Sequence, residues 1–267
     1  MNTRAVRAVL ELVADADAIC SVEDYHMALL AALAKAVPCD VVNFNDFRFD
    51  PPAGALAEPA VSCTAAPPLE PADALAPSLL ATFLRHMAEH PLIHLQAAGD
   101  ASAHRLSDVV SVRRFRHGGL YADFFRPAAI AHQLTVGFGG SPHHLVGVWL
   151  SRTDRDFSDG ELLLAELLRP HLEAGEAAAS RAVARASLTE RERQVLQVVA
   201  AGASNRAVAE VLVVSPGTVK KHLDNIYAKL AVGTRAAAVD RAGARTRRTS
   251  AGSEGGSWQC LVQDPDN

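Results

Sequence analysis

The stretch Ser215–Leu230, SPGTVKKHLDNIYAKL, decides how the C-terminal part of the chain folds. Ser215 is a favourable N-cap residue, and Pro216 follows at the first helical position, where a missing N–H removes no helical hydrogen bond. Apolar residues then recur at the spacing of one helical face: Val219, Leu223, Ile226, Tyr227 and Leu230. The stretch therefore predicts an amphipathic α-helix with one buried face.

The opposite side of this helix is polar or small. It carries Gly217, Lys220, Lys221, Asp224 and Ala228, flanked by a row of Thr218, His222, Asn225 and Lys229. A helix with one buried face and a narrow basic outer face suits the major groove of DNA. The same pattern also fits a solvated amphipathic helix, so the neighbouring segments must decide.

Three further short helices are predicted around this one. Thr189 and Glu192 form a T-x-x-E capping box that opens a helix ended by Gly202, and Ser204 caps a second helix from Asn205 to Leu212. After Gly233, Thr234 caps a last helix. Only two residues separate the second helix from Ser215, so helix, tight turn and helix follow one another as in a helix-turn-helix.

The whole run from Leu188 to Val239 resembles the C-terminal DNA-binding domain of LuxR-type transcriptional regulators. The matching motifs are Leu-Thr-x-Arg-Glu, Gly-x-Ser-Asn, Ser-x-x-Thr-Val-Lys-x-His and Lys-Leu-x-Val. The resemblance implies a domain that binds double-stranded DNA through its third helix in the major groove. By position, Lys220 and Lys221 match groove-facing residues, and Asn205, Thr218 and His222 match residues near phosphates; Asp224, Asn225 and Lys229 complete the expected set.

Two positions depart from the family pattern. Ala207 stands where Glu is usual, so the second helix lacks one half of a capping box, at a cost of about 0.5–1 kcal/mol. Asp224 stands where relatives carry a basic or amide side chain. A carboxylate accepts a hydrogen bond from cytosine N4 but repels phosphate, so Asp224 either reads a base or is an unused surface acid.

Charge is distributed unevenly along the chain. Between Arg185 and Arg248 there are 12 Lys or Arg and 5 Asp or Glu, a net charge of +7, whereas the whole chain carries −4 and the remainder therefore −11. The basic end suits a polyanion and the acidic remainder does not.

Composition places the chain among globular proteins. Its 267 residues, 49% of them hydrophobic, allow two domains. No apolar run is long enough to span a bilayer, and acids interrupt the N-terminus where a signal peptide would be apolar, so we expect a cytoplasmic protein without a membrane segment. Four scattered cysteines without a C-x-x-C pair favour reduced thiols; a redox role for Cys39 or Cys63 is the alternative.

The N-terminal part is predicted as an antiparallel sheet with flanking helices. Helical stripes cover Thr3–Ala14 and the segment from Ser21 to Pro38. Alternating residues predict a strand over Val41–Phe49, with a slip of one residue near Asn45–Asp46, and a hairpin of Ile130–Phe138 with Leu145–Leu150. Asp50–Pro71 is expected to be mostly loop, with a short strand around Leu56–Thr64 at most.

Two helical segments are predicted between these strands. One runs from Asp73 to Glu89, and another begins at a Ser107 cap and breaks at Gly118–Gly119. His86, His90 and His94 are spaced by four residues, as in a metal-binding helix, but Pro91 disfavours helical geometry at His90. We therefore interpret them as surface and loop histidines and expect no metal site and no cofactor.

The runs Tyr121–Pro127 and Glu161–Ala174 are similar to segments of LuxR-type regulators with a GAF-like N-terminal domain. Ser158 caps a long helix with an apolar stripe, which Pro170 should kink. This helix is a candidate dimer seam, because reading two half-sites requires a pair of subunits; a core helix followed by a flexible linker is the alternative.

The control mechanism stays open at this level. The helical start argues against a phospho-receiver, and the Trp/Tyr/Asp set of an acyl-homoserine-lactone sensor is missing. A different small molecule over the sheet would meet candidates Phe44, Phe47, Tyr121, His132 and Trp149, each of which could equally be a core residue. No catalytic motif is found, so no catalytic residue is assigned and no enzyme activity is expected.

The sequence thus predicts a homodimeric regulator with four parts: an α+β sensor domain over 1–157, a linker or dimerisation helix over 158–185, a helix-turn-helix domain over 186–244, and a disordered tail over 245–267. A small effector is expected to act through the sensor domain; a ligand-free dimerisation or protein-interaction module is the alternative. In the tail, Arg245, Arg247 and Arg248 could contact phosphates.

Overall fold

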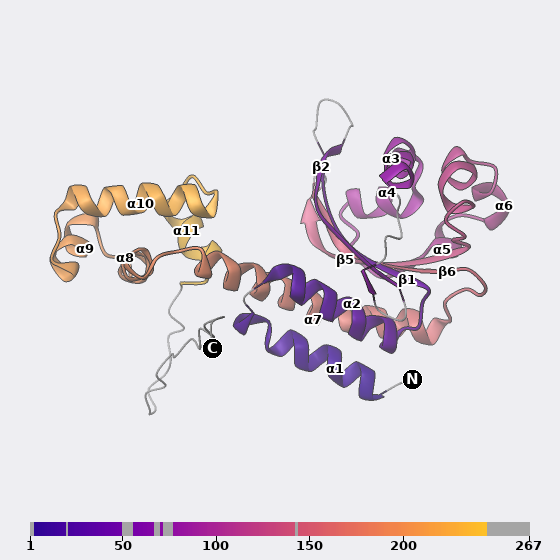
Figure 1. Ribbon diagram of the computed structural model, residues 1–267, viewed down its shortest axis with the longest axis horizontal. Coiled ribbons are helices and arrows are strands. Elements are labelled where there is room, and N and C mark those ends of the chain that lie inside the picture. The colour runs from indigo at the N-terminus through magenta and orange to yellow at the C-terminus, as the bar shows by residue number, and fades with distance from the viewer. Residues whose placement is uncertain are drawn as a thin grey trace, which may run out of the picture. The chain divides into compact units, whose positions relative to one another are not determined.

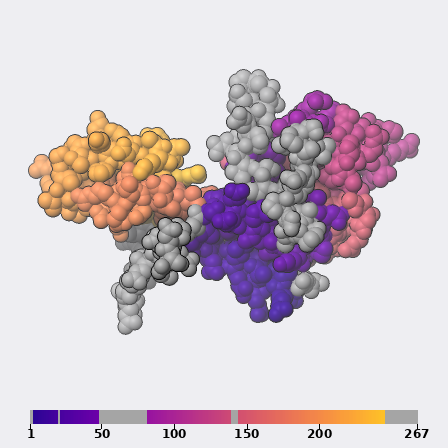
Figure 2. All heavy atoms as spheres, in the orientation of Figure 1, coloured from indigo at the N-terminus to yellow at the C-terminus, as the bar shows by residue number. Residues whose placement is uncertain are grey.

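The computed structural model of this chain describes residues 3–19, 21–49, 56–66, 70–71, 77–141 and 144–244. The chain folds as two units, residues 1–187 and 188–267. Figure 1 shows their elements, and Figure 2 shows all heavy atoms in the same orientation. The predicted tail lies outside the described residues. No helix in the described part of the chain is both long and apolar enough to cross a bilayer.

The first unit is built on a six-stranded sheet of order β3-β2-β1-β6-β5-β4, in which every described pair is antiparallel. Its strands are β1 (Val41–Phe49), β2 (Leu56–Ala66), β3 (Glu70–Pro71), β4 (His104–Arg105), β5 (His132–Ser141) and β6 (His144–Arg152). Its helices are α1 (Thr3–Ala14), η1 (Ala16–Ala18), α2 (Val22–Ala36), α3 (Pro77–His86), η2 (Met87–Glu89), α4 (Pro91–Ala97), α5 (Leu106–Val109), α6 (Val112–Phe115), η3 (Tyr121–Phe125) and α7 (Asp159–Ala186).

Both faces of this sheet are covered. In Figure 1, α1, α2 and α7 lie on one side of the strands, and α3 to α6 lie on the other. The first face buries Val42, Phe44, Val136 and Leu150 against the long helices. The second face buries Phe47 and Trp149, with other residues, in an aromatic core beneath the short helices. Because the two clusters are separate, the sheet is the middle layer of three.

The expected slip within β1 is wrong. Strand β1 pairs with β6 in unbroken register from Val41↔Ser151 to Arg48↔His144. The irregular register occurs between β1 and β2, near Asp46 and Phe47. Phe44 and Phe47 seemed out of phase because only one buried face was assumed; in fact Phe44 belongs to the first face and Phe47 to the second.

Two other local predictions need correction. The segment expected to be mostly loop contains β2, an eleven-residue strand. Arg105, not Ser107, precedes α5, and it is Ser111 whose hydroxyl caps the next short helix, α6. Helix α7 contains Pro170, and the kink expected there stays a prediction. The helices, the β5–β6 hairpin and the antiparallel sheet agree with the expected architecture.

Helix α7 packs on the first unit along most of its length, although the segment 158–185 was predicted as a separate part. Leu164, Leu168 and Leu172 are buried in the core of the first face. A Cβ atom at Gly175 would collide with the Tyr25 hydroxyl, so glycine is what allows α2 and α7 to approach this closely. The expected dimer seam is therefore also a core helix.

The start of α7 is held by a buried ion pair at the end of the sheet. Arg152, the last residue of β6, is only 3% exposed. Its guanidinium donates to both Glu161 carboxylate oxygens, at 2.6 and 3.2 Å, and to the Pro38 carbonyl oxygen at 2.7 Å. Glu161 also closes the capping box with Ser158. The hydrogen bond from Arg152 lowers the pKa of Glu161 to about 2.

We predict that Glu161→Gln lowers the free energy of unfolding of the first unit by about 3 kcal/mol, because it leaves Arg152 buried without its counter-charge. The ionised form of Glu161 is favoured by folding, so its contribution is present above the unfolded pKa of about 4.3 and is lost as pH falls towards 2. Urea unfolding of the full chain at several pH values measures both effects. The matched control is Glu173→Gln on the same helix, whose exposed contact with Arg169 should contribute under about 1 kcal/mol. Equal losses for the two variants, or a loss independent of pH, would contradict this account.

The second unit contains four helices: α8 (Glu190–Ala200), α9 (Asn205–Leu212), α10 (Pro216–Leu230) and α11 (Arg235–Arg241). The expected caps are all present at Thr189, Ser204, Ser215 and Thr234. Thr189 and Glu192 form the full capping box, whereas Ser204 caps α9 without the reciprocal acid, as the alanine at 207 implied. Local sequence signals therefore fix the boundaries of this unit.

Candidate nucleic-acid interface and candidate ligand site

Helix α10 is anchored by its inner face. Val219, Leu223, Ile226 and Leu230 are buried against the other helices of the second unit. Each such side chain contributes about 1.5–3 kcal/mol when it is fully buried. This packing leaves the opposite face of α10 free to present its polar residues.

Lys220 and Lys221 lie on the exposed face of α10. Within the described residues neither lysine forms an ion pair, whereas most other cations of this unit are engaged. Asp224 and Asn225 are exposed one turn further along. Two uncompensated ammonium groups on one rigid helix form a site for an anion such as a DNA phosphate, and they can also donate to base edges.

The other residues expected to contact DNA differ in whether neighbouring side chains already engage them. The Thr218 hydroxyl lies 2.9 Å from the Ser215 hydroxyl at the start of α10, and His222 is partly buried. Asn205 Oδ1 accepts a hydrogen bond from Arg235 at 2.9 Å, so its amide is held at the start of α9. Arg235 was not expected from the sequence, because its partner lies 30 positions away.

Lys229 has a partner within the unit. Its Nζ donates to Glu192 Oε2 at 2.7 Å, and the Glu192 side chain is almost fully buried. Burial raises the pKa of Glu192, but the hydrogen bonds from Lys229 and Thr189 together with the charge of Lys229 outweigh it, so the pKa lies below its usual value. Withdrawing Lys229 towards DNA would leave a buried carboxylate unpaired. Lys229 therefore links α8 to α10, and we do not assign it to DNA.

The turn between α9 and α10 is strained at Val213. This residue has φ 54° and ψ 52°, in the left-handed region that β-branched residues avoid, and its side chain is 89% exposed. The conformation lets the amide of Val214 donate to the Ala209 carbonyl oxygen at 3.0 Å, which ends α9 and starts the tight turn. Because Val213 is exposed, no buried side-chain contact offsets the strain of its backbone.

We predict that Val213→Asn stabilises the second unit by about 1 kcal/mol, because asparagine tolerates the left-handed conformation and no packing is lost. Slower hydrogen exchange of the Val219 and Leu223 amides in the full chain measures the change. Val211→Asn serves as the control, because Val211 is also largely exposed at 63% but lies in regular helix. Faster exchange in Val213→Asn than in the parent protein would show that the valine is not strained.

The five candidate ligand residues of the first unit do not form one site. Phe44 packs on the first face of the sheet, where its ring stacks on His26 at a centroid distance of 3.6 Å. Phe47 and Trp149 are neighbours in the aromatic core of the second face, at 5.7 Å. The sheet itself separates Phe44 from the other two.

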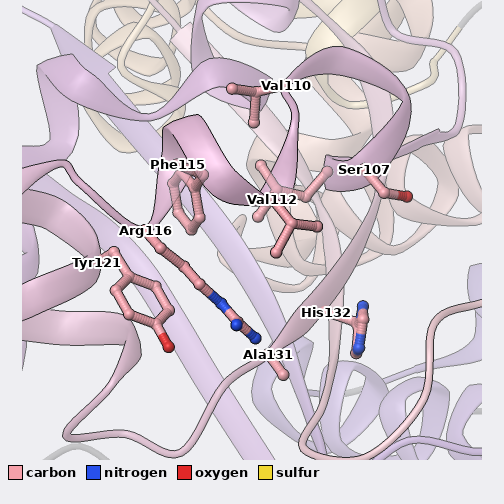
Figure 3. Close-up of a pocket in the computed structure, with 9 residues that line it drawn as sticks. Ser107, Val110, Val112, Phe115, Arg116, Tyr121, Ala131 and His132 are labelled. Atoms are coloured by element: carbon pink, nitrogen blue, oxygen red, sulfur yellow. The ribbon is translucent and has the colours of Figure 1, made fainter.

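Tyr121 and His132 instead border a small hollow at the edge of the unit. Figure 3 shows both side chains with the Arg116 side chain extending between them. Val112 and Phe115 also line the hollow. The hollow has a volume of about 10 Å³, which is room for about one water molecule. His132 Nδ1 lies 3.6 Å from Asp156. This arrangement is too small to hold an effector.

Five buried polar side chains on the second face were not found from the sequence. Asn45, Gln133 and Thr135 belong to the strands, and His90 and Gln96 belong to the start and last turn of α4. All five are at least nine-tenths buried, and each has a polar atom without a hydrogen-bond partner: Asn45 Nδ2, His90 Nε2, Gln96 Nε2, Gln133 Oε1 and Thr135 Oγ1. We call these residues the polar cluster.

The polar cluster lies beside the aromatic core. The His90 ring is 5.4 Å from Trp149 and 5.6 Å from Phe125. Its Nδ1 accepts from the Leu92 amide at 3.3 Å, so the free Nε2 carries the proton. Burial lowers the pKa of His90 to about 4, which keeps the ring neutral at pH 7, although Gln133 lies close enough to oppose this shift. Alternation along β5 places Gln133 and Thr135 on the face opposite Leu134 and Val136, and no local signal shows that this face is buried as well.

Cys39 and the three histidines have surroundings that do not favour redox chemistry or metal binding. Cys39 is buried, which raises the pKa of its thiol to about 12 and leaves little thiolate for redox chemistry. Of the three histidines, His86 pairs with Glu89 and Asp123, His90 is buried, and His94 bonds the Ala88 carbonyl oxygen. No group of three or more metal-ligating side chains occurs in the described parts of the chain. Only the backbone is described at Cys63, and Cys20 and Cys260 lie outside the described residues.

Comparisons with known proteins concern mainly the second unit. Residues 186–242 match the family of bacterial regulatory proteins, luxR family. A Mycobacterium bovis protein that bears the name of an HTH-type transcriptional regulator is 38% identical over 93 residues, 34% of this chain and 10% of that protein. The CsgBAC operon transcriptional regulatory protein of Escherichia coli is 44% identical over 63 residues, 24% of this chain and 29% of that protein.

This chain therefore spans only about a tenth to three tenths of the length of these relatives. Among solved structures, the ligand-binding domain of VqsR from Pseudomonas aeruginosa aligns with a TM-score of 0.49 and 15% identity, over 65% of this chain and 94% of that one. The family assignment rests on the sequence of the second unit and on its four capped helices. The C-terminal part of this chain is a helix-turn-helix domain of the luxR family of bacterial regulatory proteins.

Proposed function

We propose that the protein is a transcriptional regulator that binds double-stranded DNA by inserting α10 into the major groove. The observation that carries this proposal is the pair Lys220 and Lys221, exposed and without a counter-charge on a helix whose other face is buried. In this role the two ammonium groups contact base edges or groove-lining phosphates. Thr218, His222 and Asn205 contact the flanking backbone, and Asn225 extends the surface towards the bases.

Replacing both lysines by alanine should weaken binding to the preferred duplex at least about 30-fold, because each contact is worth about 1–3 kcal/mol. Gel-shift titration of the full chain against a duplex enriched from a random library measures this change. Lys35→Ala is the matched control, because Lys35 is exposed on α2 of the acidic first unit and should leave the affinity unchanged. Both substitutions are on helical surfaces and should leave the fold intact.

Retained affinity in the double variant would show that α10 is not the reading helix. Asp224→Ala distinguishes the two interpretations of that residue in the same assay. A changed base preference at one position identifies Asp224 as a reader of cytosine N4, and a uniform gain in affinity across sequences identifies it as an unused acid that repels phosphate.

Modulation by a small ligand is the second part of the proposal, and the polar cluster supports it. Few buried polar atoms in proteins lack a partner, and five lie on one face of this sheet. Ordered water can satisfy such atoms. A ligand with several polar atoms can satisfy them as well, while its apolar part packs on Trp149 and the phenylalanines around it. The GAF-like character expected for this unit stays a prediction.

The cluster favours an uncharged ligand. It offers amide N–H groups, a hydroxyl, a neutral imidazole N–H and one amide oxygen, with no carboxylate or cationic side chain among its five members. A charged ligand group would be buried there without a counter-charge, which is costly. We therefore propose a neutral molecule that carries carbonyl or hydroxyl groups on an apolar body.

Thr135→Val tests this directly, because it removes an unpaired buried hydroxyl and keeps the shape of the side chain. We expect the ligand-free protein to become more stable by about 1 kcal/mol in urea unfolding and the response to ligand to be lost. In the control Thr153→Val the hydroxyl lost donates to Asp40 at 2.9 Å, so stability should fall. A loss of stability in Thr135→Val would indicate that ordered water already satisfies the hydroxyl.

Homodimerisation through α7 is the third part of the proposal. Leu163 and Leu167 are 60% and 62% exposed and lie one turn apart, and the exposed residues Pro170, Ala174 and Ala177 continue the same face. We call these five residues the outer stripe of α7. A second copy would cover it and would supply the two-fold pairing that half-sites require. If the first unit binds no ligand, this stripe supports the alternative function, a dimerisation module.

The variant Leu163→Glu with Leu167→Glu should convert a dimer into a monomer, because it would bury four carboxylates in the paired interface. Sedimentation equilibrium of the full chain measures the mass. Val211→Glu, at an equally exposed apolar residue of the second unit, should leave the mass unchanged. Persistence of the dimer in the double variant would mean that another surface pairs the subunits.

A further inference from the structure

A second hollow of the first unit is large enough for a small molecule. It has a volume of about 320 Å³ and opens on the outer side of the helical layer that covers the aromatic core. It is lined by Glu89, Pro91, His94, Val109, Val110, Arg114, Phe115, Gly118 and Leu120. No member of the polar cluster lines it, so it is separate from the ligand site proposed above. We call it the Arg114 hollow.

About half of the exposed wall of the Arg114 hollow is apolar. Five of its nine residues are Pro91, Val109, Val110, Phe115 and Leu120. A volume of about 300 Å³ is at the lower end of the range found for small-molecule sites. The hollow therefore suits a short apolar body.

The acid at its rim, Glu89, already has partners. Glu89 Oε1 lies 2.7 Å from His86 Nδ1, and Glu89 Oε2 accepts from the Leu120 amide at 3.1 Å. The hydrogen bond to Glu89, followed by a contact with Asp123, raises the pKa of His86, and the bond to His86 lowers the pKa of Glu89. The pair thus favours the imidazolium and the carboxylate together.

The cation at its rim is not neutralised. Arg114 is exposed and forms no ion pair within the described residues. The other ionisable lining residue, His94, uses its Nε2 to donate to the Ala88 carbonyl oxygen at 2.7 Å. Neighbouring Arg113 and Arg116 are also exposed and add positive charge. Arg114 therefore lines the hollow without an ion-pair partner among the described residues.

We propose that the Arg114 hollow binds a small amphipathic carboxylate. The planar guanidinium matches the two oxygens of a carboxylate, and the apolar part of the wall takes the hydrocarbon part. A singly charged group fits better than a phosphate, because a second negative charge would approach Glu89 at the same rim. Leu120 lines the hollow and also packs in the aromatic core, so a ligand in the hollow contacts a residue of the helical layer that covers the sheet.

Hexanoate is the probe, with 1-hexanol as the neutral molecule of equal chain length. In titrations of the full chain followed by ¹H–¹⁵N NMR, hexanoate should shift the Val110, Gly118 and Leu120 amides in a saturable way. Arg114→Gln should weaken this binding at least about 10-fold, which corresponds to losing one charge-assisted pair. Arg113→Gln is the matched control, because Arg113 is exposed one position earlier but does not line the hollow.

Three results would overturn the proposal. The first is equal affinity for hexanoate and hexanol, and the second is equal weakening by the Arg113 and Arg114 variants, which would indicate non-specific charge attraction. The third is a set of shifts confined to Thr135, Trp149 and their neighbours. That last result would place the carboxylate at the polar cluster and would also contradict the neutral effector proposed there. The first two results leave that effector site untouched, so failure of this proposal can be told apart from failure of the proposed function.

Discussion

Burial of both faces of one antiparallel sheet is the constraint on which the first unit depends. Strands β1 and β6 lie at the centre of the sheet, with Phe44 packed into one core and Phe47 and Trp149 packed into the other. Each face needs its own helical layer, because an exposed aromatic face would be unstable in water. The long helices α1, α2 and α7 cover the first face, and the short pieces α3 to α6 cover the second. The pair of Arg152 and Glu161 then fixes the sheet to the first turn of α7.

The two layers serve different purposes. In the layer of long helices, α2 and α7 pack so closely that a Cβ atom at Gly175 would collide with the Tyr25 hydroxyl. The layer of short helices retains polar side chains that are buried without partners, as well as the hollow at its outer surface. Unpaired buried polar atoms reduce stability, and such atoms gather where a site needs them. Two such atoms, the Tyr25 hydroxyl oxygen and His26 Nδ1, lie on the first face and five lie on the second, so a ligand is sought on the second face.

Sequence reasoning succeeded where short-range interactions determine structure. Ser215 with Pro216, and Thr189 with Glu192, define helix starts within four residues, so the second unit could be drawn nearly complete from the sequence. It failed where a partner lies far along the chain. Lys229 pairs with Glu192 and Asn205 pairs with Arg235, so two residues expected to contact DNA are already engaged within the unit. Helices also cover the second face of the sheet, so Phe47 and Gln133 are both buried there. Periodicity shows that a residue is apolar or polar, but it cannot show how many layers a sheet will have.

The central claim is that two copies of this chain bind one duplex through α10 while each carries a neutral ligand over its sheet. Native mass spectrometry of the full chain, purified from cells and mixed with its preferred duplex, tests all three elements in one spectrum. The account predicts two chains per duplex, each with an added non-covalent mass that disappears in the Thr135→Val protein. A complex of one chain per duplex with no added mass would contradict both the pairing and the ligand, and the absence of any complex would contradict the assignment of α10.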